Sequence, residues 1–537
     1  MDHLTIAPIV IPLFIATLMI LLAQQRRKVR AALGLVSAVA LLAVAIALLQ
    51  VADSPDGAAV RVYRLGDWPS QFAIVLVLDR LSALMLLLTS VLGLAALVFS
   101  LAHWHRTGAH FHPLFQFQLM GLNGAFLTGD LFNLFVFFEV MLAASYGLAL
   151  HGSGVLRVRA GLHYIVVNLT TSLLFLIGVS VIYGVAGTLN MADLADRIPN
   201  IAARDRALVE AGAAILGVAF LVKTAVWPLG FWLPTTYAAA TAPAAAILSI
   251  LSKVGVYAVL RLWLLLFGDA AGASAGFGGA WLMGAGLLTV GFGSVAVLAT
   301  QSMARLAGAS VLVSSGTLVA AIGAGQVDVT GGALFYLASS VLAIAAFFLL
   351  IELVERGRDP GADVLAVTRE AFGEGEEEDL DEEDEIGVAI PATIAILGMS
   401  FMICALVLSG LPPLSGFLAK FAILAPLFGP GAADVSATAW ALLAALILSG
   451  MATIIAMTRA GIDAFWVPPD RTLPRMRVTE IGPVIVLLVL CVALTVKPGP
   501  VQQYMLATAH SLHAPRDYVR GVLPEPAAAA PAPRVIQ

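Results

Sequence analysis

Long apolar runs dominate this chain of 537 residues and recur from its beginning to near its end. Most runs are about 20 residues long, the length that an α-helix needs to cross a bilayer. The alternating ten-residue pattern of outer-membrane barrels is absent. We therefore predict an all-α polytopic membrane protein with about fourteen transmembrane helices. The expected spans are 4–22, 31–51, 72–101, 113–128, 131–150, 161–184, 207–228, 238–267, 281–299, 306–325, 333–353, 388–428, 437–457 and 481–496.

Composition supports the membrane assignment and excludes several classes of protein. Hydrophobic residues make up 60% of the chain and charged residues only 12%, whereas soluble domains are about one quarter charged. The two cysteines, Cys404 and Cys491, lie inside apolar runs, so neither a disulfide framework nor a thiolate metal site is expected. The chain shows no nucleophile elbow and no phosphate-binding loop. We expect no cofactor, no metal, no nucleic-acid partner and no covalent chemistry.

The charged residues outside the spans predict the orientation of the chain. The segment 374–385 holds ten acidic residues and no basic one, and without it the net charge changes from −5 to +5. This segment is expected to be a solvated, disordered cytoplasmic loop. The strongly basic segment 24–30 is also expected in the cytoplasm by the positive-inside rule. With fourteen spans, both termini would be periplasmic in a bacterial inner membrane.

Four titratable residues stand inside apolar spans and are the candidate functional residues. They are Glu139, Lys223, Lys253 and Lys420. An ionisable side chain at the bilayer centre costs about 2.5–3.5 kcal/mol on insertion scales, so such residues are functional candidates by default. Most arginines lie in loops instead, and a buried lysine can lose its proton whereas arginine does not. The alternative is that these residues form structural ion pairs that fix helix packing.

Prolines interrupt the two spans that carry Lys223 and Lys420. Pro228 frees a backbone carbonyl beside Lys223, and Pro412 and Pro413 free the carbonyls of residues 408 and 409 before Lys420. Both spans are therefore expected to break at membrane depth, which is tolerated only inside protein or beside a water-filled cavity. These are the seventh and twelfth spans, an odd number of crossings apart, so one is inverted relative to the other. Such a pair is the expected sign of an inverted-repeat transporter.

This pattern divides the chain into four regions. Residues 1–110 would hold helices 1–3, residues 111–268 a first five-helix repeat, and residues 269–458 a second, inverted repeat with the acidic cytoplasmic loop 356–386. Residues 459–537 would hold the last helix and a disordered tail. At the start of the third span, Asp79 and Arg80 are expected to form a local ion pair.

Three segments together resemble one known family. They are DLFNLFVFFEVMLAASYGL at 130–148, LVKTAVWPLGFWLPTTYAAATAPAAAILSILSKVGVYAVLR at 221–261, and LSGLPPLSGFLAKF at 408–421. They resemble the D subunits of the multisubunit cation/proton antiporters (Mrp, Mnh or Pha type), which are similar to the antiporter-like subunits of respiratory complex I. The resemblance covers about residues 70 to 500. It implies fourteen helices, with discontinuous helices 7 and 12.

The resemblance also implies a role for each candidate residue. Glu139 would pair with Lys223, Lys253 would relay protons, and Lys420 would serve the second half-channel. Separation of Glu139 from Lys223 would release a proton toward Lys253 and then Lys420. The chain would work in a hetero-oligomer with other antiporter subunits in the lipid bilayer, exchanging Na⁺ or K⁺ for protons.

The chain departs from the broader family where a relay histidine is expected. Gly230 follows Pro228-Leu229 where a histidine is common, and the eleventh span lacks its histidine. We therefore predict that hydroxyls and water join Lys253 to Lys420. The candidates are Ser314, Ser315, Thr317, Tyr336, Ser339 and Ser340.

Two other functions compete with the antiporter assignment. One is a proton-pumping subunit of a redox-driven complex, of the complex I or membrane-bound hydrogenase type. The other is a structural membrane scaffold without an ion path of its own.

Overall fold

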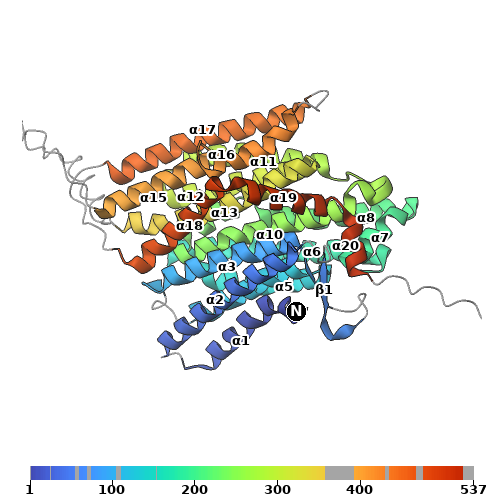
Figure 1. Cartoon of the computed structure of the whole chain (residues 1–537), viewed down its shortest axis with the longest axis horizontal. Coiled ribbons are helices and arrows are strands. Elements are labelled where there is room, and N and C mark those ends of the chain that lie inside the picture. Colours follow the sequence, from blue (N-terminus) through green and yellow to red (C-terminus); the bar gives the residue numbers. More distant parts are fainter. Residues whose placement is uncertain are drawn as a thin grey trace, which may run out of the picture.

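The computed structural model describes residues 2–23, 26–54, 60–68, 74–104, 110–152, 154–356, 392–429, 435–466 and 476–523. The acidic segment 374–385 and the end of the expected tail, from residue 524, lie outside these residues. Within them, the chain is a bundle of helices that run roughly side by side (Figure 1).

The helices follow the predicted spans closely. They are α1 (Ala7–Leu21), α2 (Arg27–Ala52), α3 (Arg80–Ser100), α4 (Phe111–Leu127), α5 (Leu131–Ala149), α6 (Val155–Ala186), α7 (Met191–Arg197), α8 (Ala203–Thr224), α9 (Trp232–Ala239), α10 (Ala242–Phe267), α11 (Gly279–Ala299), α12 (Met303–Gly323), α13 (Val327–Glu355), α15 (Ala392–Ser409), α16 (Ser415–Leu424), α17 (Ala437–Phe465), α18 (Val478–Val496), α19 (Pro498–Leu512) and α20 (Pro515–Val522). Among the described helices, twelve are long and apolar enough to cross a membrane. The shorter helices α1 and α4 match two further predicted spans, so the total of fourteen stays a prediction.

Both predicted helix breaks are present. The seventh span divides into α8 and α9, and the twelfth divides into α15 and α16. The broken helix is therefore the fourth in each of two sets of five helices. The sets are α4, α5, α6, α8–α9 and α10, and α11, α12, α13, α15–α16 and α17. This order agrees with two five-helix repeats, whose inverted relationship stays a prediction.

The centre of the bundle is α13. Its most apolar stretch is entirely buried, and it packs against α10, α12, α15, α16, α18 and α19. Because α10 and α12 are also nearly fully buried, the polar side chains of these three helices are shielded from lipid. By contrast only 33% of the most apolar stretch of α2, of α15 and of α18 is buried, as expected for helices at the lipid boundary.

The start of the third predicted span is a strand rather than a helix. Strands β1 (Arg61–Arg64) and β2 (Val75–Leu78) pair antiparallel, with Arg61 opposite Leu78. The helix α3 begins only at Arg80, because the Asp79 carboxylate accepts the backbone N–H of Ser82 in a capping box. A short apolar run such as that of β2 does not distinguish a buried strand from a helix by its periodicity.

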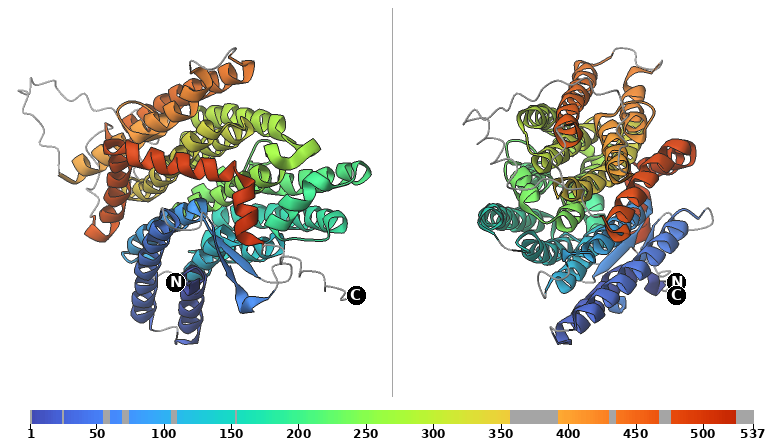
Figure 2. Two further views of the ribbon diagram at one scale, coloured as in Figure 1. Left: turned by 45° about the vertical axis from the view of Figure 1, so that its right-hand side comes forward. Right: turned by 90° about the vertical axis from the view of Figure 1, so that its left-hand side faces the viewer.

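Two helices follow the last predicted span. Residues 498–522 form α19 and α20 after the last predicted span, and both helices begin with a proline at their first turn. Each has an apolar side that is buried, with Met505 and Leu512 on α19 and Tyr518 and Val522 on α20. As Figures 1 and 2 show, α19 runs along the bundle and α20 turns at its end, where it contacts α7 and β1. These two helices were not predicted from the sequence.

Candidate functional site

Lys223 lies in the last turn of α8, directly before the first helix break. Only 6% of the residue is exposed. Its Nζ lies 3.5 Å from the side-chain amide oxygen of Asn168 on α6 and 5.5 Å from the centre of the Phe138 ring. We expected a backbone carbonyl freed by Pro228 beside this ammonium. The hydrogen-bond partner in the structure is the amide of Asn168 instead.

Glu139 on α5 was expected to pair with Lys223 but does not form an ion pair with it. Its carboxylate, which is half-buried, accepts a hydrogen bond from the hydroxyl of Ser172 on α6. Within the described part of the chain, no ion pair joins Glu139 to Lys223. Each side chain instead binds its own partner on α6, Ser172 for Glu139 and Asn168 for Lys223, and these two partners stand four residues apart on that helix. The predicted pair is thus not closed in this structure.

Lys253 lies at the centre of the bundle. The residue is fully buried on α10, and its Nζ donates a hydrogen bond of 3.1 Å to the hydroxyl of Ser315 on α12. A cavity of about 10 Å³, near the smallest space that holds one water, lies between Lys223 and the α10 residues Val254 and Gly255. The cavity therefore extends from Lys223 to the turn of α10 that carries Lys253.

Hydroxyl groups continue from Lys253 toward the second broken helix. Ser314, the neighbour of Ser315, donates a hydrogen bond of 3.0 Å to Ser340 on α13. Ser339, the neighbour of Ser340, shares a hydrogen bond of 2.8 Å with Ser415 at the first residue of α16. All these hydroxyls are buried. We call the set Ser315, Ser314, Ser340, Ser339 and Ser415 the hydroxyl line.

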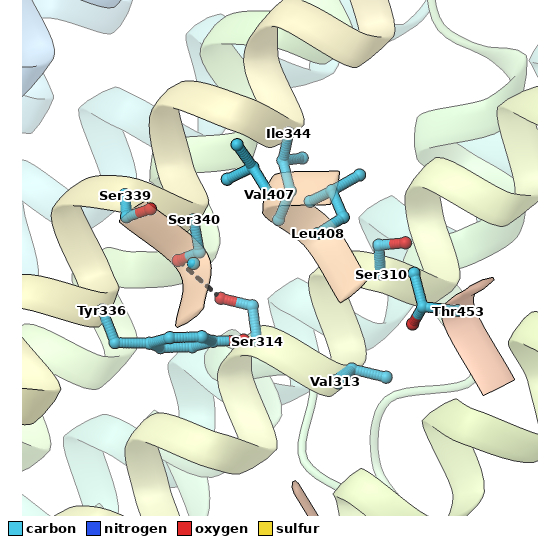
Figure 3. A pocket seen from close by; sticks show the side chains of 11 residues that line it. Ser310, Val313, Ser314, Tyr336, Ser339, Ser340, Ile344, Val407, Leu408 and Thr453 are labelled. Carbon is cyan, nitrogen blue, oxygen red and sulfur yellow. Dashed lines mark hydrogen bonds between the residues drawn. The ribbon is translucent and has the colours of Figure 1, made fainter. Parts of the chain in front are cut away.

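A second cavity of about 10 Å³ lies beside the hydroxyl line. Figure 3 shows the hydrogen bond between Ser314 and Ser340 and the ring of Tyr336 directed toward Ser314. The sixth predicted hydroxyl, that of Thr317, donates to the carbonyl of Val313 in its own helix and also forms a hydrogen bond with the hydroxyl of Tyr336. The structure therefore brings all six predicted hydroxyls to one region, and it adds Ser415, which the sequence analysis missed.

Lys420 ends this arrangement on α16, and 8% of the residue is exposed. Its Nζ donates a hydrogen bond of 2.8 Å to the backbone carbonyl of Ser409, the last residue of α15. This is one of the carbonyls that Pro412 and Pro413 were predicted to free. The C-terminal end of a helix carries partial negative charge, which further favours an ammonium group there.

Sequence reasoning also missed a buried ion pair outside this line. Asp79 does not pair with its neighbour Arg80: it forms a two-point ion pair with Arg261 on α10, and one of the two contacts measures 2.8 Å. Arg80 pairs with Asp53 at the surface. The available signal was Arg261 itself, an arginine inside the apolar eighth span. Asn168 stands in the sixth span in the same way, and a polar residue in an apolar run predicts a buried partner.

Two interrupted membrane helices, each holding a buried lysine, are typical of ion-translocating secondary transporters. The comparisons specify the family. The sequence matches the family described as NADH:quinone oxidoreductase/Mrp antiporter, transmembrane, over residues 128–452. The chain therefore belongs to the NADH:quinone oxidoreductase/Mrp antiporter family.

Individual relatives are similar over nearly the whole chain. A protein of Rhizobium meliloti (strain 1021), named as the probable D subunit of a K(+)/H(+) antiporter, is 58% identical over 98% of this chain and 99% of its own. A protein of Alkalihalophilus pseudofirmus, named as the D subunit of a Na(+)/H(+) antiporter, is 33% identical over 98% of this chain and 100% of its own. Among solved structures, a chain of the Mrp complex from Dietzia sp. DQ12-45-1b has a TM-score of 0.81 at 25% identity, covering 98% of this chain and 100% of that one.

Proposed function

We propose that this chain is the proton-conducting subunit of a multisubunit monovalent cation/proton antiporter, and that the exchanged cation is K⁺. The observation that supports the proposal is a series of four separate buried hydrogen bonds between the two lysines: Lys253 with Ser315, Ser314 with Ser340, Ser339 with Ser415, and Lys420 with the carbonyl of Ser409. The choice of K⁺ is supported by the 58% identity to a relative named for K⁺/H⁺ antiport, against 33% for one named for Na⁺/H⁺ antiport.

In the proposed mechanism, lysines take up and release protons and hydroxyls with water carry them between lysines. A buried lysine can exist without its charge, so each of the three can serve as a station. Lys223 would pass its proton to Lys253 through one water in the small cavity beside Val254 and Gly255. The hydroxyl line then supplies donors and acceptors as far as Ser415, five residues before Lys420 on α16.

Glu139 would control the first of these stations. At an effective dielectric constant of about 20, a carboxylate attracts an ammonium group by about 4 kcal/mol at 4 Å and about 2 kcal/mol at 8 Å. The difference of about 2 kcal/mol changes the protonation equilibrium of a lysine roughly 30-fold. The arrangement with Glu139 bound to Ser172 would be the one in which Lys223 releases its proton.

Partners and orientation belong to the same proposal. Because its relatives are antiporter subunits, the chain would assemble with the other subunits of such a complex in a bacterial inner membrane. Both termini would be periplasmic, and the acidic segment 374–385 cytoplasmic. Labelling of single cysteines placed at Arg27 and at Val501 in whole cells tests this: only the second should react with an impermeant reagent.

The direct test is transport by the assembled complex in vesicles. We expect an outward K⁺ gradient to drive proton uptake, with smaller responses to Na⁺ and Li⁺. Equal or larger exchange with Na⁺ would contradict the assignment of K⁺. Co-purification with iron–sulfur and quinone-binding subunits, together with redox-dependent proton pumping, would support the redox-driven alternative. The scaffold alternative requires unchanged transport when Lys253 or Lys420 is replaced in an assembled complex.

A further inference from the structure

A cavity of about 140 Å³ lies at the outer side of the first helix break and is not part of the lysine route. Its walls are the connection between α8 and α9 (residues 225–231), Thr289 and Phe292 on α11, and Leu312 on α12. This volume is similar to that of the engineered apolar cavities, about 150 Å³, that stay dry and bind benzene or xenon.

The cavity opens at the lipid-facing surface of the described structure. Trp227, Phe231 and Phe292 are 40%, 62% and 43% exposed, and the rings of Trp227 and Phe292 lie 6.5 Å apart at the opening. The neighbouring α11 residues Leu288 and Val295 are exposed and apolar as well. An opening surrounded by such residues gives access to hydrocarbon rather than to water.

The depth of the cavity is fixed by two helices that border it. Both α11 and α12 have 21 residues, a length of about 31 Å at 1.5 Å per residue, close to the thickness of the hydrocarbon core. Thr289 and Leu312 stand at the middle of these helices. The cavity therefore lies near the bilayer midplane, where lipid contributes acyl chains and no headgroups.

The polar group in the wall is already occupied. The hydroxyl of Thr289 accepts the backbone N–H of Trp227 at 2.9 Å and donates to the carbonyl of Ala285 at 2.6 Å. A water needs two to four polar partners to enter a cavity, whereas the exposed lining of this cavity is mostly apolar and its threonine hydroxyl is engaged on both sides. The chemistry of the wall therefore favours an apolar occupant over water or an ion.

We propose that this cavity is a binding site for the acyl chain of a membrane lipid. The chain enters between Trp227 and Phe292 and packs against residues 225–231, the segment that begins two residues after Lys223. The bilayer thus supplies part of the packing around the first helix break. Occupancy of the site does not depend on ion exchange, so this proposal can fail or hold separately from the proposed function.

The test uses the assembled complex in lipid nanodiscs made with phosphatidylcholine whose acyl chains carry bromine atoms, compared with unbrominated phosphatidylcholine. Electron cryo-microscopy of the two samples should give a difference density inside the cavity between Trp227, Thr289 and Leu312. A side chain of a neighbouring subunit in that place would overturn the proposal. Identical densities from the two lipids would overturn it too.

A pair of matched variants makes the test specific for the cavity. Leu312→Phe enlarges a side chain in the wall and should remove the bromine density. Leu288→Phe adds the same group on α11 at a lipid-facing position, 57% exposed, and should leave the density in place. Bromine density that persists in Leu312→Phe would contradict the site. If Leu312→Phe fails to assemble, the comparison of the two lipids in the unaltered complex still decides the proposal.

Discussion

The ammonium of Lys420 on α16 donates to the backbone carbonyl of Ser409, at the end of α15, over 2.8 Å. The two residues belong to the two halves of one broken helix, so the break itself supplies the acceptor for the lysine. Gly410 stands directly behind this contact with φ of 77°, a conformation that residues with a side chain adopt at a cost.

Replacement of Gly410 by alanine should therefore disturb Lys420 specifically. A Cβ atom at residue 410 would lie 2.7 Å from Cδ and 2.9 Å from Nζ of Lys420, and the left-handed conformation adds about 1–2 kcal/mol. We expect roughly tenfold slower exchange, because the added Cβ atom would displace the ammonium of Lys420 from the carbonyl of Ser409, a hydrogen bond of a charged group that is worth about 1.5–3 kcal/mol. The control is Gly398→Ala on α15, the helix that ends just before Gly410, because an added Cβ atom there meets no atom within 4 Å. Equal rates for the two variants in vesicles would contradict the role of this contact.

The contact between Lys420 and Ser409 illustrates what the sequence can predict. Proline removes a specific hydrogen bond four residues back along a helix, so the position of the freed carbonyl follows from local chemistry alone. The same reasoning located both helix breaks, and apolar length located the spans. These features depend on residues that are close together in the sequence.

The features that the sequence did not predict depend on how helices are rotated and packed. Glu139 and Lys223 bind Ser172 and Asn168 instead of each other, and the side chains that meet between helices cannot be read from an apolar run. Asp79 pairs with Arg261, 182 residues away, instead of with Arg80. Ser415 became part of the hydroxyl line only because α16 packs against α13.

The hydroxyl of Ser315 should matter more than other buried hydroxyls, because it is the hydrogen-bond partner of a fully buried ammonium. Ser315→Ala leaves Lys253 without this partner, a loss of about 1–3 kcal/mol. We expect exchange to slow by roughly 5- to 150-fold while the complex still assembles. Ser249→Ala on α10 is the control, because that hydroxyl is equally buried but bonds to the carbonyl of Ala246 in its own helix. A similar loss of exchange in the Ser249 variant would show that Ser315 has no special place.

Ser339 and Ser415 should behave as one unit if the hydrogen bond between them carries protons. The hydroxyl of either one has lost its partner when the other is replaced by alanine. We expect the double variant to exchange no more slowly than the slower single variant, with a coupling of at least about 0.5 kcal/mol in a double-mutant cycle. The cycle compares initial rates of proton uptake in vesicles for the unaltered complex, the two single variants and the double variant. Additive losses would place the two hydroxyls in separate roles.

The ion pair of Asp79 with Arg261 should dominate the stability of the region around α3 and α10. Both side chains are at least 95% buried, and Asp79→Ala leaves the Arg261 charge without its carboxylate partner. Loss of one partner of a buried pair costs about 3–5 kcal/mol. The matched surface pair of Arg80 with Asp53 is partly exposed, so Asp53→Ala should cost less than about 1 kcal/mol. Thermal unfolding of the purified complex should therefore show a clear fall in midpoint for Asp79→Ala and almost none for Asp53→Ala.

Variants of Lys223 distinguish most directly between two roles for this lysine, a carrier of protons and a fixed charge that holds helices together. Lys223→Arg keeps the positive charge near Asn168 but cannot release a proton, so we expect an assembled complex without exchange. Lys223→Ala should also stop exchange.

Ser172→Ala removes the hydrogen bond that holds the Glu139 carboxylate on α6, so it should free Glu139 to approach Lys223 and slow proton release without abolishing it. Glu139→Gln should assemble and exchange more slowly, because the group that controls Lys223 is gone. Vesicle assays from neutral to alkaline pH, with assembly checked on native gels, compare all four variants. Normal exchange by Lys223→Arg would mean that this lysine serves only as a fixed charge, and the proton route would then have to begin at Lys253.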